Sequence, residues 1–260
     1  MGAVFDALRE SLRTESPVAL ATVIDGPDAG AKLLVYQDGR QLGSLGNADL
    51  DRVVARDALA ELESGRSGVR HYGASGEARQ ADISVFIESH AARPQLVIFG
   101  AVDFTRALAA QGKLLGFRVT VCDAREVFAT KRRFPMADEV VVDWPNRLLD
   151  RIGDSLGPRD AVCVLTHDNK FDVPAIVSAL ATRVGYIGAM GSRRTTDTRN
   201  DRLRDEGVTA EELARVMAPI GLDIGSRSPE ETAVSIVAEI ISTRTGRTAP
   251  NLKDRDGAIH

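Results

Sequence analysis

Cysteine is scarce in this chain of 260 residues, and its scarcity argues against most metal and redox chemistry. The two cysteines, Cys122 and Cys163, both fall inside short apolar runs, where a small apolar side chain packs well. No Cys-x-x-Cys pair occurs, which argues against zinc sites, iron–sulfur clusters and thioredoxin-like redox chemistry. We therefore expect two buried free thiols.

Long hydrophobic runs and an excess of positive charge are also missing. No apolar stretch approaches the roughly 20 residues that a helix needs to cross a bilayer, and the amino terminus lacks the apolar core of a signal peptide. The formal net charge is -4 and the basic residues are scattered, so there is no general attraction to nucleic acid. The sequence predicts a cytoplasmic protein without a membrane span or a nucleic-acid partner.

Five short apolar runs with nearly constant spacing are the main positive signal. Their centres lie about 22 residues apart, which is the interval needed for one strand and one crossover helix. Polar and glycine-rich segments follow nearly every run, as expected where ligands bind at the carboxyl edge of a parallel sheet. The spacing predicts an α/β unit over residues 93–245, and its parallel strands are expected at Leu96–Phe99, Val119–Cys122, Val140–Val142, Ala161–Leu165 and Val184–Ile187.

Residues 1–92 carry the pattern of a small α+β domain. An amphipathic helix is expected over 3–14, a second helix starts at Asn47 or Asp49 and runs to about Glu63, and strands are expected at 18–24, 32–36, 41–45 and 83–87. In the parallel unit, helix starts are expected at Asp172-Val173-Pro174, at Thr209 with Glu212, and at Ser228–Glu231. The composition after Thr245 predicts a disordered tail over residues 246–260.

The segment after the first parallel strand matches a dinucleotide-binding loop only in part. A Gly-x-Gly-x-x-Gly loop admits a pyrophosphate because glycine alone permits the tight turn and the close contact. Here Gly100 is followed by Val102, which crowds that path, and by Asp103, which repels phosphate. Gly100 and Asp103 still lie at the expected carboxyl edge, so both are candidate cofactor-binding residues, as are Asp123 and Arg125 after the next strand. Asp123 directly follows the next strand, at the position where dinucleotide-binding proteins carry the carboxylate that binds the ribose. The alternative is an acidic residue that only caps the turn at the end of the strand. Arg125 lies two residues further on. NAD(P) binding is therefore weakened, though not excluded.

Thr166, His167 and Asp168 follow the fourth parallel strand. A neutral imidazole at this edge can act as a general base, a donor or a ligand, with Asp168 or Asp172 orienting it. His167 with one nearby carboxylate is a weak metal site, since divalent metals need three or four ligands. The alternative is a plain turn, which His167-Asp168-Asn169 forms without any function.

The segment after the fifth strand combines glycine with arginine. Glycine lets the backbone turn close to a ligand, free amides and the helix dipole attract an anion, and an arginine fork grips phosphate in two places. The alternative is a solvated basic helix start whose arginines pair with Asp197 or Asp201. Because the arginines occur at the turn, we favour an anion site, with phosphate as the anion, at Gly191, Ser192, Arg193 and Arg194.

Three longer stretches carry a family pattern: Val-Leu-Thr-His-Asp (164–168), Tyr-Ile-Gly-Ala-Met-Gly-Ser-Arg-Arg-Thr (186–195) and Pro-Ile-Gly-Leu-Asp-Ile-Gly-Ser-Arg-Ser-Pro-Glu-Glu (219–231). Together they resemble the carboxyl-terminal domain of the XdhC/CoxI family, over roughly residues 94–243. Pro17–Thr22 and Ala31–Val35 resemble the family's amino-terminal domain. Proteins of this family are associated with the maturation of molybdenum hydroxylases such as xanthine dehydrogenase and carbon monoxide dehydrogenase.

The resemblance implies a Rossmann-like domain preceded by a small α+β domain. It also implies an accessory protein, a chaperone more than an enzyme, that binds the molybdenum cofactor (molybdopterin). Its partners would be an apo molybdenum hydroxylase or a cofactor sulfurase, and a homodimer is expected because such domains commonly form one. The molybdopterin phosphate is then a plausible occupant of the Gly191–Arg194 segment.

Two segments depart from the family pattern. Where relatives commonly carry Gly-Gly-Cys-x-Glu, this chain has Leu45-Gly46-Asn47-Ala48-Asp49. Where they commonly carry Gly-Ala-Gly-His-x-Gly, it has Gly100-Ala101-Val102-Asp103-Phe104-Thr105. If the family's cysteine is a molybdenum ligand or a sulfur relay, Asn47 cannot perform that step. A divergent paralogue with an altered ligand or partner is therefore one outcome.

Two other functions compete with cofactor handling. One is an NAD(P)-dependent oxidoreductase that uses Asp123 for the ribose and His167 as acid and base. Val102 and Thr105 argue against it. The other is a scaffold that keeps the fold and has lost its ligand, against which the Gly191–Arg194 segment argues.

Overall fold

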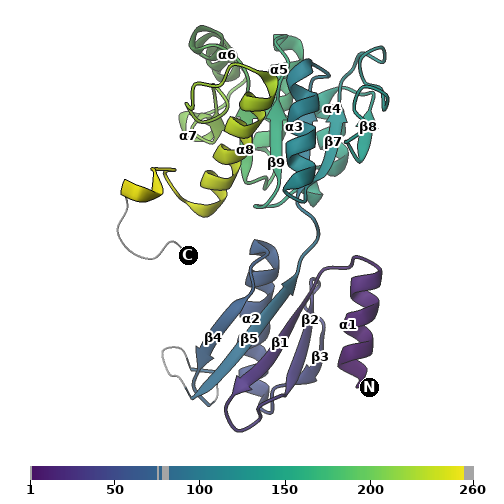
Figure 1. The fold of residues 1–260 in the computed structure, drawn as a ribbon, viewed down its shortest axis with the longest axis vertical. Coiled ribbons are helices and arrows are strands. Elements are labelled where there is room, and N and C mark those ends of the chain that lie inside the picture. Colours follow the sequence, from purple (N-terminus) through teal and green to yellow (C-terminus); the bar gives the residue numbers. More distant parts are fainter. Residues whose placement is uncertain (1, 75, 78–81, 255–260) are drawn as a thin grey trace. The chain divides into compact units, whose positions relative to one another are not determined.

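A computed structural model describes residues 2–74, 76–77 and 82–254 of the chain. The chain divides into two compact units, residues 1–92 and residues 93–260 (Figure 1). Each unit has its own hydrophobic core.

The amino-terminal unit is an antiparallel sheet with a helix on each face. Its strand order is β3-β2-β1-β5-β4. One helix buries Leu50 and Val54 against the sheet, and the other packs Val4 and Leu8 on the opposite face. The elements are α1 (Ala3–Arg13), β1 (Val18–Asp25), β2 (Lys32–Tyr36), β3 (Gln41–Ser44), α2 (Ala48–Ser64), β4 (Gly68–Tyr72) and β5 (Ile83–His90).

Strand β4 is the one element of this unit that the sequence pattern does not predict. It pairs only with β5, at the edge of the sheet, and three of its five residues are exposed. An edge strand has no second partner and no fully buried face, so its sequence carries little apolar alternation. The segments around residues 75 and 78–81, between β4 and β5, lie outside the described residues.

The second unit is a six-stranded, fully parallel sheet in the order β11-β10-β9-β6-β7-β8. This confirms the predicted α/β fold class. Its elements are β6 (Gln95–Phe99), α3 (Asp103–Leu114), β7 (Arg118–Cys122), β8 (Glu139–Val141), α4 (Pro145–Ile152), η1 (Gly153–Ser155), β9 (Ala161–Val164), α5 (Asn169–Leu180), β10 (Tyr186–Ala189), α6 (Arg193–Asp205), α7 (Ala210–Leu213), β11 (Val216–Met217), α8 (Pro229–Thr245) and η2 (Leu252–Asp254).

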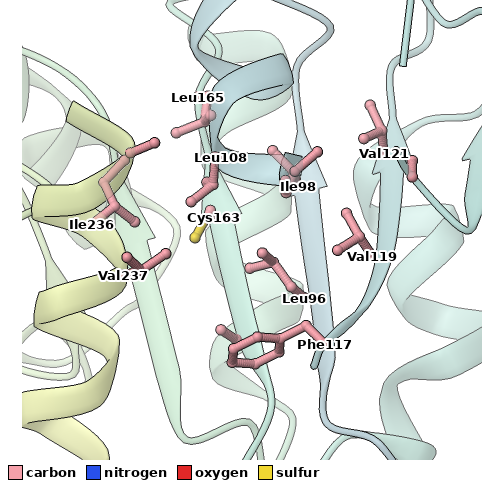
Figure 2. Packing of buried hydrophobic residues seen from close by; sticks show 14 of the residues in the cluster. Leu96, Ile98, Leu108, Phe117, Val119, Val121, Cys163, Leu165, Ile236 and Val237 are labelled. Carbon is pink, nitrogen blue, oxygen red and sulfur yellow. The ribbon is translucent and has the colours of Figure 1, made fainter. Parts of the chain in front are cut away.

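Alternate strand residues enter two different cores. Leu96, Ile98 and Cys163 face α3 and α8, as Figure 2 shows. Val97, Phe99 and their neighbours face the opposite layer of α4, α5 and α6. The strand order reverses between β6 and β9, and in such sheets ligands bind at the carboxyl edge near this switch point.

Two predicted starts in this unit are wrong by two residues or more, and one short strand was missed. Helix α5 begins at Asn169 and not at Asp172, because the Asp168 side chain accepts the Lys170 amide and caps the helix three residues earlier. The fifth strand starts at Tyr186, two residues late, and the two-residue β11 was not predicted. The capped starts at Thr209 and Ser228 are confirmed, each with a complete capping box.

The expected tail begins where α8 ends. Gly246 adopts the left-handed conformation that terminates the helix. Leu252–Asp254 then form a short 3-10 turn, and residues 255–260 lie outside the described residues. No helix among the described residues is long and apolar enough to cross a membrane.

Candidate functional site

The loop after β6 closes on itself. Gly100 has a φ of +107°, and a Cβ atom there would lie 2.6 Å from Cγ2 of Thr166. The loops after β6 and β9 therefore approach as closely as only glycine allows. Thr105 stands where a dinucleotide loop has its last glycine; it is fully buried and its hydroxyl donates to the Gly100 carbonyl. The Thr105 side chain thus fills the space between helix and strand that the last glycine of such a loop leaves open.

Asp123 makes the contacts of a turn-capping acid. One of its carboxylate oxygens accepts the Ala101 amide at 2.8 Å, and the other accepts the Arg125 amide at 2.9 Å. The Arg125 guanidinium adds a two-pronged ion pair, with distances of 2.9 and 2.8 Å. Burial acts to raise the pKa of Asp123, but Arg125 and the two amides outweigh it and hold the pKa below its ordinary value. Every oxygen that a ribose would need is already engaged.

The loop after β9 divides into a buried and an exposed part. Thr166 is buried, and its hydroxyl donates to the buried carboxylate of Asp172. His167 is exposed, and Asp168 caps α5 and lies 3.2 Å from the Lys170 ammonium. Both aspartates therefore have structural partners, and no described side chain orients the His167 ring through a hydrogen bond.

Helix α6 begins with a row of unused donors. Ser192 is its N-cap and accepts the Thr195 amide at 3.2 Å. Within the described part of the chain, the four consecutive amides of Gly191–Arg194 donate no hydrogen bond. Arg193 and Arg194 are exposed and make no ion pair there. Free amides, a helix dipole and two exposed guanidinium groups are the features that suit an oxyanion.

The residue that sequence reasoning missed is Arg199. It is 1% exposed and lies under the loop, where its Nη1 donates to the Met190 carbonyl at 2.9 Å and sits 3.4 Å from Asp172. Because the peptide is trans, a Met190 carbonyl turned inward directs the Gly191 amide outward. Thr196, Arg199 and Leu203 share one buried face of α6, and this i, i+3, i+7 spacing is the signal that could have found it.

The buried pair is incompletely satisfied. Nε and Nη2 of Arg199, and the hydroxyl of Thr196 one turn away, are buried with no hydrogen-bond partner in the described structure. Burial lowers the pKa of Arg199 and raises that of Asp172, while each charge opposes the shift of the other. Unpaired buried donors of this kind are rare in folded proteins, and they give the loop polar groups that are not yet used.

The structure brings most of the predicted residues to one edge. The Gly100 loop contacts Thr166, Asp123 and Arg125 bond to each other and to that loop, and Arg199 ties the α6 loop to Asp172. Asp103 is the exception, because it lies exposed on the first turn of α3 and lines a different groove.

Neither cysteine is placed for metal or sulfur chemistry. Cys122 and Cys163 are both fully buried and face opposite sides of the sheet. Burial raises the pKa of Cys122 to about 12 and that of Cys163 further. Asn47 caps α2 by accepting the Asp49 amide at 2.8 Å. No group of three or more His, Cys, Asp or Glu side chains that could hold a metal ion is found among the described residues.

An antiparallel domain with two helices, followed by a Rossmann-like parallel domain, defines the class of this protein. Comparison with known families gives the same division. Residues 96–240 match the XdhC Rossmann domain, and residues 11–73 match the XdhC and CoxI family. The chain belongs to the XdhC and CoxI family.

Three relatives place the chain within that family. It is 30% identical to the uncharacterized protein YqeB of Escherichia coli K12, over 88% of this chain and 44% of the relative. It is 35% identical to a protein of Bacillus subtilis named as a probable subunit of xanthine dehydrogenase, over 62% of this chain and 46% of the relative. The chain thus spans about half the length of these two. The molybdenum cofactor insertion chaperone PaoD of E. coli is 22% identical over 90% of this chain and 86% of PaoD.

One solved structure shares the whole architecture. A crystal structure described as a xanthine dehydrogenase from Bacillus halodurans superposes with a TM-score of 0.53. It covers 96% of this chain and 98% of its own, at 22% identity. At this identity the likeness supports the fold alone.

Proposed function

We propose that this chain is a maturation factor that binds the molybdenum cofactor and delivers it to an apo molybdenum hydroxylase such as xanthine dehydrogenase or carbon monoxide dehydrogenase. The observation that carries the proposal is the row of four unused amides at Gly191–Arg194, flanked by two free arginines. A relative that aligns over nearly its full length is named as a molybdenum cofactor insertion chaperone, which supports the same role.

The cargo would be held by its phosphate. A terminal phosphate offers three acceptor oxygens, and the backbone amides with Arg193 and Arg194 offer matching donors. The residues fit the phosphate and give no thiolate for the molybdenum, since Asn47 replaces the family's cysteine and both thiols are buried. The proposed site therefore comprises the α6 start together with the edge formed by Gly100, Asp123, Arg125, Thr166, His167 and Asp168.

In this proposal the chain is a binding protein and not a catalyst. Its partners are an apo hydroxylase or a cofactor sulfurase, and it acts as a homodimer. The alternative, an NAD(P)-dependent oxidoreductase, is disfavoured because Asp123 and Thr105 already use the groups that a dinucleotide would contact. A scaffold without a ligand is disfavoured because four amides and two arginines at the start of α6 have no partner among the described residues.

A double substitution tests the site. Arg193→Ala with Arg194→Ala removes two exposed side chains that make no described contact, so the fold should be unchanged. A charge-assisted hydrogen bond contributes about 1.5–3 kcal/mol, and affinity for the molybdenum cofactor should therefore fall at least about tenfold. Affinity is measured by equilibrium ultrafiltration with released cofactor, with NAD(H) and NADP(H) in parallel.

The matched control removes the same charge from the other end of the same helix. Arg202→Ala with Arg204→Ala takes two exposed arginines from the last turn of α6 and should leave affinity unchanged. An equal loss of affinity in both double variants would show that the effect comes from the change in net charge and not from a specific site. Unchanged cofactor affinity in the Arg193 and Arg194 variant would remove the site assignment.

A further inference from the structure

A groove on the other helical layer plays no part in the site described above. It has a volume of about 790 Å³ and lies where the starts of α3 and α8 meet the loop that follows β7. Helices α3 and α8 pack side by side on one face of the sheet (Figure 1), while α6 packs into the core of the opposite face. The groove and the α6 start are therefore separate surfaces.

The floor and walls of the groove come from α3, from the loop after β7 and from the start of α8. The floor is the outward stripe of α3, where Ala107 and Ala110 leave room because their side chains are short. Phe134 forms one wall and is 2% exposed, anchored in the core below α3 and α8. Pro229 forms the other wall at the first position of α8, which the Ser228 capping box fixes. The volume lies within the range of small-molecule sites, about 300–1,000 Å³.

Three arginines line this space and none is neutralised there. Arg106 and Arg132 are exposed and make no hydrogen bond or ion pair within the described chain. Arg133 is held in place, because its guanidinium lies 5.5 Å from the ring centre of Phe128 and 5.4 Å from that of Phe134. Two carboxylates, Asp103 and Glu230, also line the groove, yet no ion pair joins either of them to an arginine in the described structure.

The start of α3 adds backbone donors. Its N-cap residue is Val102, which has no side chain able to accept a hydrogen bond. The amides of Asp103 and Phe104 donate to nothing in the described structure. The start of α8 differs, because Glu231 accepts the amides of Arg227 and Ser228. Three guanidinium groups and an uncapped helix start outnumber the two carboxylates of Asp103 and Glu230, so the groove as a whole favours a multiply charged anion.

We propose that this groove binds a phosphorylated small molecule. Arg106 and Arg132 grip its phosphate groups, Arg133 completes the positive wall, and the body of the molecule rests on the alanine floor against Phe134. Guanidinium groups from two different elements suit a phosphate ester better than a single carboxylate, since each fork matches two phosphate oxygens. The proposal is independent of the cofactor role, because it shares no residue with the start of α6.

The test uses a variant in which the arginines at the start of α6 have been removed, so that the α6 site does not contribute to binding. In the full chain carrying Arg193→Ala and Arg194→Ala, isothermal titration with inorganic pyrophosphate, AMP and ATP should give one saturable site for at least one of these probes. Adding Arg106→Gln and Arg132→Gln should weaken that binding at least about tenfold. Adding Arg202→Gln and Arg204→Gln instead removes the same charge from α6 and should change nothing.

A steric variant separates the floor from the charges. Ala110→Leu keeps a good helix former and fills the groove, so it should weaken the nucleotide more than inorganic pyrophosphate. The proposal is overturned if none of the probes binds at millimolar concentration, or if the Arg106 and Arg132 variant binds as tightly as its parent. Binding of an acidic peptide such as oligoglutamate with higher affinity than every phosphate probe would also overturn it and assign the groove to a protein partner.

Discussion

Arg199 shows how one buried side chain can set the geometry of an exposed loop. It pulls the Met190 carbonyl inward and lies against Asp172, whose other oxygen accepts the Thr166 hydroxyl. The loops after β9 and β10 are therefore joined by one buried polar chain. A buried ion pair adds little net stability, but breaking it leaves an uncompensated charge. The pair is better understood as fixing the loop than as stabilising the fold.

We expect Arg199→Met to lower the free energy of unfolding by about 3–5 kcal/mol, because Asp172 is left buried without its cation. Adding Asp172→Asn removes the orphaned charge and should restore most of that loss. Urea unfolding measures both effects. The double variant should nevertheless bind phosphorylated ligands more weakly than the unmodified chain, because no side chain then holds the Met190 carbonyl inward and the Gly191 amide outward. A double variant as unstable as the single one would contradict this account.

At the scale of elements, the loop after β6 and the two strands that flank β6 carry the segments on which dinucleotide and thiol chemistry would depend. Thr105 fills the space of the missing glycine and hydrogen-bonds to Gly100, so the loop is already closed. Strands β7 and β9 carry the two cysteines inward, into opposite cores. The loop and the two strands are well formed. The loop lacks the glycines that a dinucleotide would need, and the strands hold no exposed thiolate that could bind a metal.

NAD(H) should bind this chain weakly, and Val102→Gly with Thr105→Gly should improve binding by reopening the loop. The gain is limited because glycine in the first turns of α3 costs about 1 kcal/mol of stability. Calorimetry with NADH measures the change. Val102→Ala with Thr105→Ser keeps a Cβ at both positions and serves as the control. A tight complex of the unmodified chain with NAD(H) would show this reasoning to be wrong.

Both thiols should react slowly with a thiol reagent in the native protein. Burial raises the pKa of Cys122 to about 12 and that of Cys163 further, so almost no thiolate is present near neutral pH. The labelling rate is followed with a chromogenic disulfide, with the urea-unfolded protein as the fast reference. A folded Cys122→Ser, Cys163→Ser variant should keep its ligand binding. Fast labelling of the native protein, together with loss of ligand binding in the folded variant, would show that Cys122 or Cys163 takes part in ligand binding.

At the scale of the whole molecule, the chain is two units with separate cores. No core cluster of described residues includes side chains from both sides of residue 92. The two family matches fall on either side of the same position, at residues 11–73 and 96–240. Every residue of the proposed phosphate site and of the second groove lies in the later unit.

Residues 93–260 alone should therefore fold cooperatively and bind phosphorylated ligands as the full chain does. The reason is that the site depends on strands and helices whose core lies entirely within this unit. Urea unfolding measures the cooperativity, and the dependence of the unfolding free energy on urea concentration should be smaller than for the full chain because less surface is buried. Titration with the same ligand measures binding. An unfolded or aggregated fragment would show that the first unit is needed for the second.

Sequence periodicity was sufficient for the elements that are buried on both faces. The strands of the parallel sheet are short apolar runs because helices cover both sides of it, and the capping boxes at Thr209 and Ser228 are local patterns with local causes. The edge strands β4 and β11 gave no such signal, since β4 is half exposed and β11 has two residues. The start of α5 was misplaced because three aspartate and asparagine residues there are all able to cap a helix.

The sequence by itself determined the fold class and the family, because each depends on patterns of residues that are close together along the chain. The anion site at Gly191–Arg194 stays a prediction. Only the tertiary structure decided which charges are buried and which are free. Arg199 and Asp172 meet across 27 positions, Asp123 spends its carboxylate on Ala101 and Arg125, and Arg106 and Arg132 share one groove while remaining unpaired in the described structure. Pairing and burial depend on contacts between distant segments, and those contacts exist only once the sheet has assembled.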